Sequence, residues 1–151
     1  MSLLDYGLID VPAIAHWLCV QGITSGVTSV GCGRGKLEAL LVPLVGEVVG
    51  VDSSEKRLVS AARGVVKFET ISQKRSFIEV NEGHVMLMVF PINIIPFGLY
   101  VDAYKGPRLV IIADDTCDPL PHAVIGGFVI VHNEVVPAHG RTVTMTVYDR
   151  L

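Results

Sequence analysis

Cysteine is scarce in this sequence, and its arrangement excludes the frameworks that cysteine usually builds. Cys19, Cys32 and Cys117 lie far apart and form no C-x-x-C pair. Disulfide-stabilised domains usually carry a denser and even-numbered set of cysteines, and structural zinc sites usually contain C-x-x-C pairs. We therefore expect an intracellular, cytoplasmic protein without a structural metal.

An excess of positive charge is also lacking. Lys and Arg number 12 against 15 Asp and Glu, which gives a net charge of −3 and a pI near 5.9. The basic residues are scattered along the chain rather than clustered. A nucleic-acid-binding domain usually carries a basic stripe, so the charge does not indicate a nucleic-acid partner.

No hydrophobic run is long enough to span a membrane. A spanning helix needs ~20 consecutive apolar residues. The first residues, MSLLDYGLIDVP, contain no basic segment and no long apolar segment, so we expect no signal peptide and no membrane partner. The longest apolar run, Val85–Val101, is interrupted by Pro91, Asn93, Pro96 and Gly98.

Apolar residues are nevertheless abundant. They make up 50% of the 151 residues, and the mean hydropathy is +0.53. This length fits one domain covering 1–151. The apolar content fits a parallel sheet that is covered on both faces. It also fits a buried interface between copies of the chain, so a homo-oligomer remains an alternative.

Apolar runs bounded by turn residues predict seven strands. Five of them are separated by helical patterns or long connections and should be parallel. The last two alternate in polarity around PAHGR, which predicts an antiparallel hairpin. The expected strands are Val27–Val30, Val48–Val51, Val65–Ile71, Val85–Phe90, Leu109–Ala113, Phe128–Val136 and Thr142–Tyr148.

Helical patterns lie between these strands. The expected fold class is therefore α/β: a three-layer sandwich with a mostly parallel seven-stranded sheet and a C-terminal antiparallel hairpin. The polar stretch after Ile71 predicts a loop. Four helices are expected. The first begins after Asp10, and the second carries Leu37 to Leu44 and is disturbed at Pro43. The third runs from a cap at Ser53 or Ser54 to Gly64, and the fourth lies within Pro91–Lys105.

A glycine-rich turn, Gly31-Cys32-Gly33-Arg34-Gly35, joins the first strand to a helix. Glycines at such a turn let the backbone pass close to a ligand. Asp52 ends the next strand, where an acid can bind ribose hydroxyls. The turn alone would also suit a tight strand-to-helix connection, but with Asp52 it favours a nucleoside-type ligand. The G-x-G-x-G spacing matches neither a dinucleotide fingerprint nor a Walker loop.

Two segments, VTSVGCGRGKLEALL and EVVGVDSS, resemble the first and second motifs of class I S-adenosylmethionine-dependent methyltransferases. YGLIDVPAIAHWL and MVFPIN resemble a subgroup of small methyltransferases. The resemblance implies a Rossmann-like fold, S-adenosylmethionine as cofactor, and glycines packed against its methionine portion. Ser29 stands where the family usually has an acid. The implied cofactor-binding residues are Ser29, Gly31, Cys32, Gly33, Gly35, Asp52, Ser53, Phe90 and Pro91.

The block Phe90-Pro91-Ile92-Asn93 occupies the position where amino-methylating relatives carry Asn/Asp-Pro-Pro-Tyr/Phe. Because Phe and Ile replace two motif residues, the resemblance does not extend to an amine-directed mechanism. Asn93 is a catalytic candidate as a displaced polar group, or a helix cap. Asp114, after the fifth strand, is a second candidate, or a turn residue. His122 and His139 are the candidate bases among the histidines.

These residues leave two functions open. The first is a methyltransferase acting on an unidentified acceptor, which could be macromolecular because the connections are short. The second is a catalytically inactive methyltransferase-like module for binding or assembly. A nicotinamide-dependent oxidoreductase is disfavoured, because it needs a different glycine spacing and a substrate domain.

Overall fold

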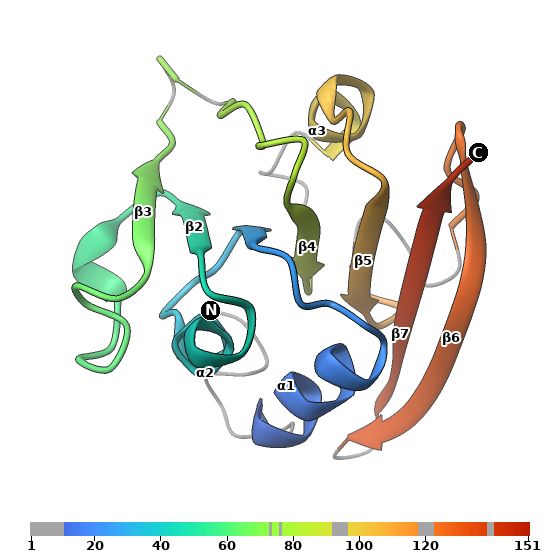
Figure 1. Ribbon diagram of the computed structural model, residues 1–151, viewed down its shortest axis with the longest axis horizontal. Coiled ribbons are helices and arrows are strands. Elements are labelled where there is room, and N and C mark those ends of the chain that lie inside the picture. Colours follow the sequence, from blue (N-terminus) through green and yellow to red (C-terminus); the bar gives the residue numbers. More distant parts are fainter. Residues whose placement is uncertain (1–10, 73, 76, 92–96, 118–122, 139–140) are drawn as a thin grey trace.

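The computed structural model describes residues 11–151 except 73, 76, 92–96, 118–122 and 139–140. Within these residues the chain forms one seven-stranded sheet in the order β3-β2-β1-β4-β5-β7-β6 (Figure 1). The first five strands are parallel, and β7 and β6 are antiparallel. The strands are β1 (Val27–Val30), β2 (Val48–Asp52), β3 (Lys67–Thr70), β4 (Val85–Val89), β5 (Arg108–Ala113), β6 (Phe128–Ala138) and β7 (Arg141–Arg150).

The central strands are buried on both faces, which explains their continuous apolar sequence. Every residue of β1 and β4 is buried, as are all but the first of β5. In the register of the sheet, Val27 lies between Val48 and Val85. Strands covered on both faces read as unbroken apolar runs, and the expected parallel sheet with its terminal hairpin is confirmed.

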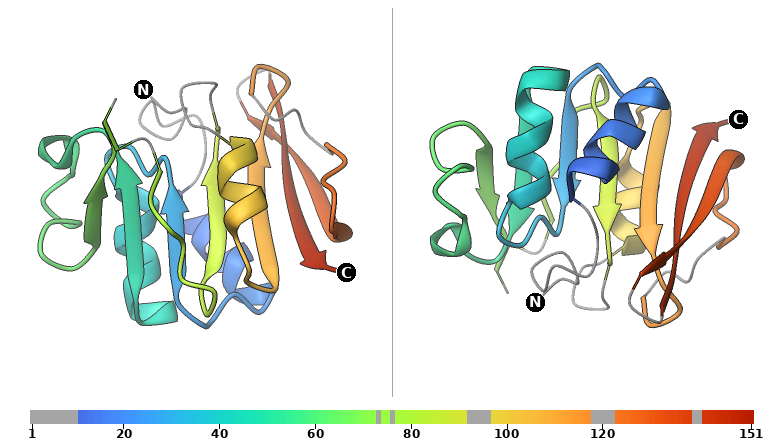
Figure 2. Two further views of the ribbon diagram at one scale, coloured as in Figure 1. Left: turned by 90° about the horizontal axis from the view of Figure 1, so that it is seen from above. Right: turned by 90° about the horizontal axis from the view of Figure 1, so that it is seen from below.

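Three α-helices among the described residues complete the layers. α1 (Val11–Val20) and α2 (Lys36–Val45) cover one face of the sheet, and α3 (Phe97–Ala103) covers the other (Figure 2). The three-layer arrangement is therefore confirmed. α2 continues through Pro43 and ends where the Gly46 N–H donates to the Val42 carbonyl. No described helix has the length and apolar content that a membrane crossing requires.

The helix expected after Ser53 and Ser54 is wrong. The chain forms only the short 3-10 helix η2 (Glu55–Arg57), and then Leu58 adopts an extended backbone. The Val59 N–H donates to the Arg34 carbonyl at 2.9 Å instead of to a helical partner. Leu58 and Ala62, whose spacing suggested a helix, instead lie next to Gly35 of the glycine-rich turn.

The loop expected after Ile71 is confirmed for the described residues up to His84, which form no helix or strand. Strand order reverses between β1 and β4, because the chain runs outward from β1 in one direction and from β4 in the other. Ligands of open α/β sheets bind outside the carboxyl ends of the strands at this point. The fold thus brings the ends of β1, β2 and β4 to one edge.

Candidate functional site

The glycine-rich turn uses backbone conformations that favour glycine. Gly31, Gly33 and Gly35 have φ values of +84°, +59° and +75°. Residues with a Cβ rarely adopt these values. The Gly31 and Cys32 N–H groups both donate to the Val51 carbonyl, which joins the start of the turn to the end of β2. The spacing of the glycines is therefore a requirement of the turn itself.

Gly35 also permits a close contact. A Cβ at this position would lie 2.9 Å from Leu58 Cδ2 and 3.0 Å from Ala62 Cβ. Those two residues belong to the segment in which the Val59 N–H donates a hydrogen bond to the Arg34 carbonyl. The third glycine of the turn therefore serves packing between the start of α2 and the chain after β2.

Asp52 lies directly opposite this turn. Its Oδ2 accepts a hydrogen bond from the Gly33 N–H at 2.7 Å, and its Oδ1 accepts one from the Ser53 N–H at 2.7 Å. Both bonds fix the direction of the carboxylate. An ionised carboxylate has about four acceptor positions, so each oxygen keeps capacity for one further donor. The structure thus holds the Asp52 carboxylate against the glycine-rich turn.

Cys32 fills the space beneath the turn. The side chain is buried, and a Cβ on Gly50 of β2 would lie 2.8 Å from its Sγ. Burial raises the pKa of the thiol far above its ordinary value, and the charges of Glu38 and Asp52 raise it further. A thiol that stays protonated is a poor nucleophile. The geometry agrees with a packing role.

Ser29 bonds to an acid that the sequence analysis missed. Its hydroxyl donates to Glu38 Oε2 at 2.7 Å, and both side chains are buried. Glu38 lies in the first turn of α2. One signal was available: Glu38, Leu41 and Val45 follow the i, i+3, i+7 spacing of a helix face that packs on a core.

Phe90 and Pro91 follow β4, and both side chains are buried. Phe90 has a φ of +50°, and no other described non-glycine residue has a positive value. Its N–H donates to the Ile112 carbonyl at 2.7 Å. Strained backbone of this kind is concentrated at functional sites. Asn93, the catalytic candidate of this block, lies outside the described residues.

Asp114 is fully buried at the end of β5. Its Oδ1 accepts hydrogen bonds from the Thr116 N–H at 2.9 Å and from the Cys117 thiol at 3.4 Å. These contacts give it a role in the turn that follows, and a catalytic role stays a prediction. The candidate bases His122 and His139 lie outside the described residues. Among the residues described, no group of three or more His, Cys, Asp or Glu could hold a metal.

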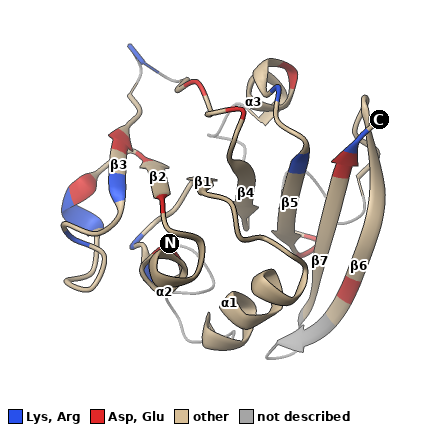
Figure 3. Cartoon of the chain, viewed as in Figure 1, with Lys and Arg blue, Asp and Glu red and all other residues tan. Residues whose placement is uncertain are grey.

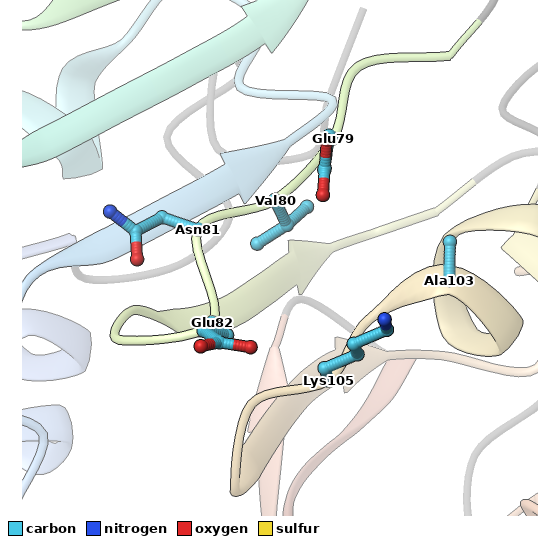
Figure 4. Close-up of a pocket in the computed structure, with 6 residues that line it drawn as sticks. All are labelled: Glu79, Val80, Asn81, Glu82, Ala103 and Lys105. Atoms are coloured by element: carbon cyan, nitrogen blue, oxygen red, sulfur yellow. The ribbon is translucent and has the colours of Figure 1, made fainter.

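The described basic residues do not gather at this site, and one surface hollow lies away from it. Figure 3 shows Lys and Arg spread over several elements rather than gathered on one. A hollow of about 290 Å³ lies between the loop before β4 and the end of α3 (Figure 4). Its lining residues precede β4 and β5, so it belongs to the amino edge of the sheet, opposite the glycine-rich turn. They are Glu79, Val80, Asn81, Glu82, Ala103 and Lys105.

No protein-family model matches the chain, and no curated protein matches it in sequence. Solved structures do match. TrmN from Thermus thermophilus shares 20% identity over 93% of this chain with a TM-score of 0.65, and the chain spans only 49% of that protein.

Two further structures match with better coverage of their own length. Magnesium protoporphyrin IX methyltransferase from Synechocystis PCC 6803, with bound SAM, shares 17% identity over 93% of this chain and 78% of its own, with a TM-score of 0.66. The N-methyltransferase NodS from Bradyrhizobium japonicum WM9 shares 12% identity over 91% and 93%, with a TM-score of 0.65. This chain therefore has the Rossmann-like fold of class I methyltransferases.

Proposed function

We propose that the protein is an S-adenosylmethionine-dependent methyltransferase. One observation carries the proposal: the left-handed glycine-rich turn at the end of β1 is hydrogen-bonded through Gly33 to the carboxylate of Asp52. A cofactor with a ribose and an amino-acid portion needs both features, a backbone that it can approach closely and an acceptor for two hydroxyls. The fold and a neighbour with bound SAM support the same cofactor.

The residues present fit this cofactor. Gly31 and Gly33 put no Cβ between the backbone of the turn and a ligand at its surface. Asp52 is already held by the N–H groups of Gly33 and Ser53, so binding a ribose would cost it little side-chain entropy. Each carboxylate oxygen can then accept one hydroxyl.

Bound S-adenosylmethionine supplies a methyl group on a positively charged sulfur, ready for displacement. The chain then has to hold the acceptor in line, and alignment alone provides much of the rate enhancement. Phe90 and Pro91 directly follow β4, which lies beside β1, and the Phe90 N–H is held by a hydrogen bond to the Ile112 carbonyl. Asn93 would contact the acceptor, and a base is needed only where the acceptor atom carries a proton.

The acceptor is proposed to be large. The connections after β3 and β5 contain no helix among their described residues. We therefore expect them to provide little protein to enclose a small molecule, so that a macromolecule or a second subunit would complete the site. Transfer of a labelled methyl group to protein, RNA and small-molecule fractions would separate these classes. Label found only in small molecules, with a monomer in solution, would contradict this part of the proposal.

The cofactor claim is tested by replacing Asp52. Asp52→Ala removes both ribose acceptors and should weaken the binding of S-adenosylhomocysteine by at least about tenfold, because a hydrogen bond to a charged group contributes about 1.5–3 kcal/mol. Isothermal titration calorimetry measures the change. Asp102→Ala, an exposed position on α3, is the matched control and should bind as the wild type does. Equal affinity in both variants would contradict the assigned role of Asp52.

The alternative is a module that keeps the cofactor site without catalysis. It is favoured by Phe90, which stands where amine-methylating relatives have Asn or Asp. Binding of S-adenosylhomocysteine together with no methyl transfer to any fraction, and a stable oligomer in light scattering, would support it. A monomer that methylates an acceptor would exclude it.

A further inference from the structure

Glu38 is a buried acid without an assigned function. Only 2% of its surface is exposed, and its partner Ser29 is fully buried. A buried carboxylate is costly to keep ionised, and an apolar residue would pack more favourably in its place. The hydrogen bond from Ser29 and the favourable field at the start of α2 are among the interactions that offset that cost.

The carboxylate lies behind the glycine-rich turn. Ser29 is the last but one residue of β1, immediately before Val30 and the first glycine of the turn. The Glu38 charge also acts on Cys32 within the turn, with a larger effect on the pKa of that thiol than the charge of Asp52. An ionised Glu38 would therefore act on this turn from the side of α2.

The position of the cationic part of the cofactor follows from the proposed function. That proposal assigns the ribose to Asp52 at the end of β2 and the amino-acid portion to the glycine-rich turn at the end of β1, which lies between β2 and β4. The part beyond the ribose, which in S-adenosylmethionine carries a sulfonium and an ammonium, thus passes in front of the Ser29–Glu38 pair.

We propose that Glu38, oriented by Ser29, selects the cationic end of the cofactor through the glycine-rich turn. The carboxylate would be supplied from α2 instead of from β1, where Ser29 stands. This inference rests on the proposed function. Glu38 acts through its charge rather than by contact, because its side chain is covered, and a charge in such an interior is weakly screened.

A purely structural role would have a different signature. If Glu38 only joins α2 to β1, its loss lowers the melting temperature and affects all ligands of the site alike. If it selects cations, its loss weakens the binding of a ligand with net positive charge most. Three probes form such a series: 5′-methylthioadenosine is uncharged, S-adenosylhomocysteine carries an ammonium beside a carboxylate, and S-adenosylmethionine adds a sulfonium and has a net positive charge.

The experiment measures the three affinities by calorimetry in the wild type and in Glu38→Gln, which keeps the acceptor for Ser29. Affinity should fall less than twofold for 5′-methylthioadenosine, a few-fold for S-adenosylhomocysteine, and about tenfold for S-adenosylmethionine. Glu55→Gln removes an exposed charge on η2 at the same edge and is the control, with all three affinities unchanged. Equal losses for the three ligands, or none, would overturn the proposal.

A second pair of variants moves the charge back to the strand. Ser29→Asp with Glu38→Gln should restore the preference for the charged ligands, whereas Ser29→Asn with Glu38→Gln should not. These two proteins differ in one charge at one position, so they carry the test if Glu38→Gln alone fails to fold. Equal selectivity in the pair would contradict the inference. Failure of the wild type to bind S-adenosylhomocysteine would instead contradict the proposed function.

Discussion

Gly50 and Cys32 illustrate how single residues set the distance between β2 and the glycine-rich turn. Cys32 Sγ occupies the space that a side chain at position 50 would need. At the same scale, Glu38 shows what sequence reading missed. Its position on the apolar face of α2 was visible, but a glutamate is seldom fully buried. In the structure it is buried with its carboxylate hydrogen-bonded to Ser29.

Gly50→Ala should lower the free energy of unfolding by about 1–3 kcal/mol, because the new methyl group would lie 2.8 Å from Cys32 Sγ and 3.4 Å from Val66 Cγ1. Urea unfolding followed by circular dichroism measures it. Gly98→Ala on α3 is the control: outside its own helix backbone and chain neighbours, no atom of the described residues lies within 4 Å of the added Cβ. Alanine there should stabilise the helix by about 0.5–1 kcal/mol. Similar destabilisation by both substitutions would contradict the close contact.

At the scale of elements, the strands were largely predictable and the segment after β2 was not. β1, β4 and β5 are continuous apolar runs because they are covered on both faces. Leu58 and Ala62 have helical spacing, yet both pack on Gly35, and the Val59 N–H bonds to the turn. Gly35 and Arg34 lie far from this segment in the sequence, so the local spacing of apolar residues does not reveal the contact.

Gly35→Ala tests this attachment. The substitution places a Cβ at a φ of +75° and against Leu58 and Ala62, so it should cost about 2–4 kcal/mol of stability. Hydrogen exchange should also show lost protection at the Val59 amide. Gly64→Ala isolates the backbone part, since its φ is +80° and nothing lies within 4 Å; its cost should be about 1–2 kcal/mol. Equal costs would show that the packing on Gly35 contributes nothing.

At the scale of the whole molecule, the strand order places every described site residue at one edge of the sheet. The motif resemblance identified Gly31, Gly33, Gly35 and Asp52, and the structure brings them together as one hydrogen-bonded unit. The catalytic assignments depended on Asn93 and Asp114. The first lies outside the described residues, and the second is buried in its own turn, so the fold indicates the cofactor more directly than the acceptor.

The central claim is that this edge binds S-adenosylmethionine, and a calorimetric titration of the wild-type protein with S-adenosylhomocysteine tests it most directly. We predict saturable binding of one ligand per chain with a dissociation constant in the micromolar range, which corresponds to about −8 kcal/mol. Bound ligand should also raise the melting temperature, because it stabilises only the folded state. Absence of binding heat and of any thermal shift at millimolar ligand would contradict the account.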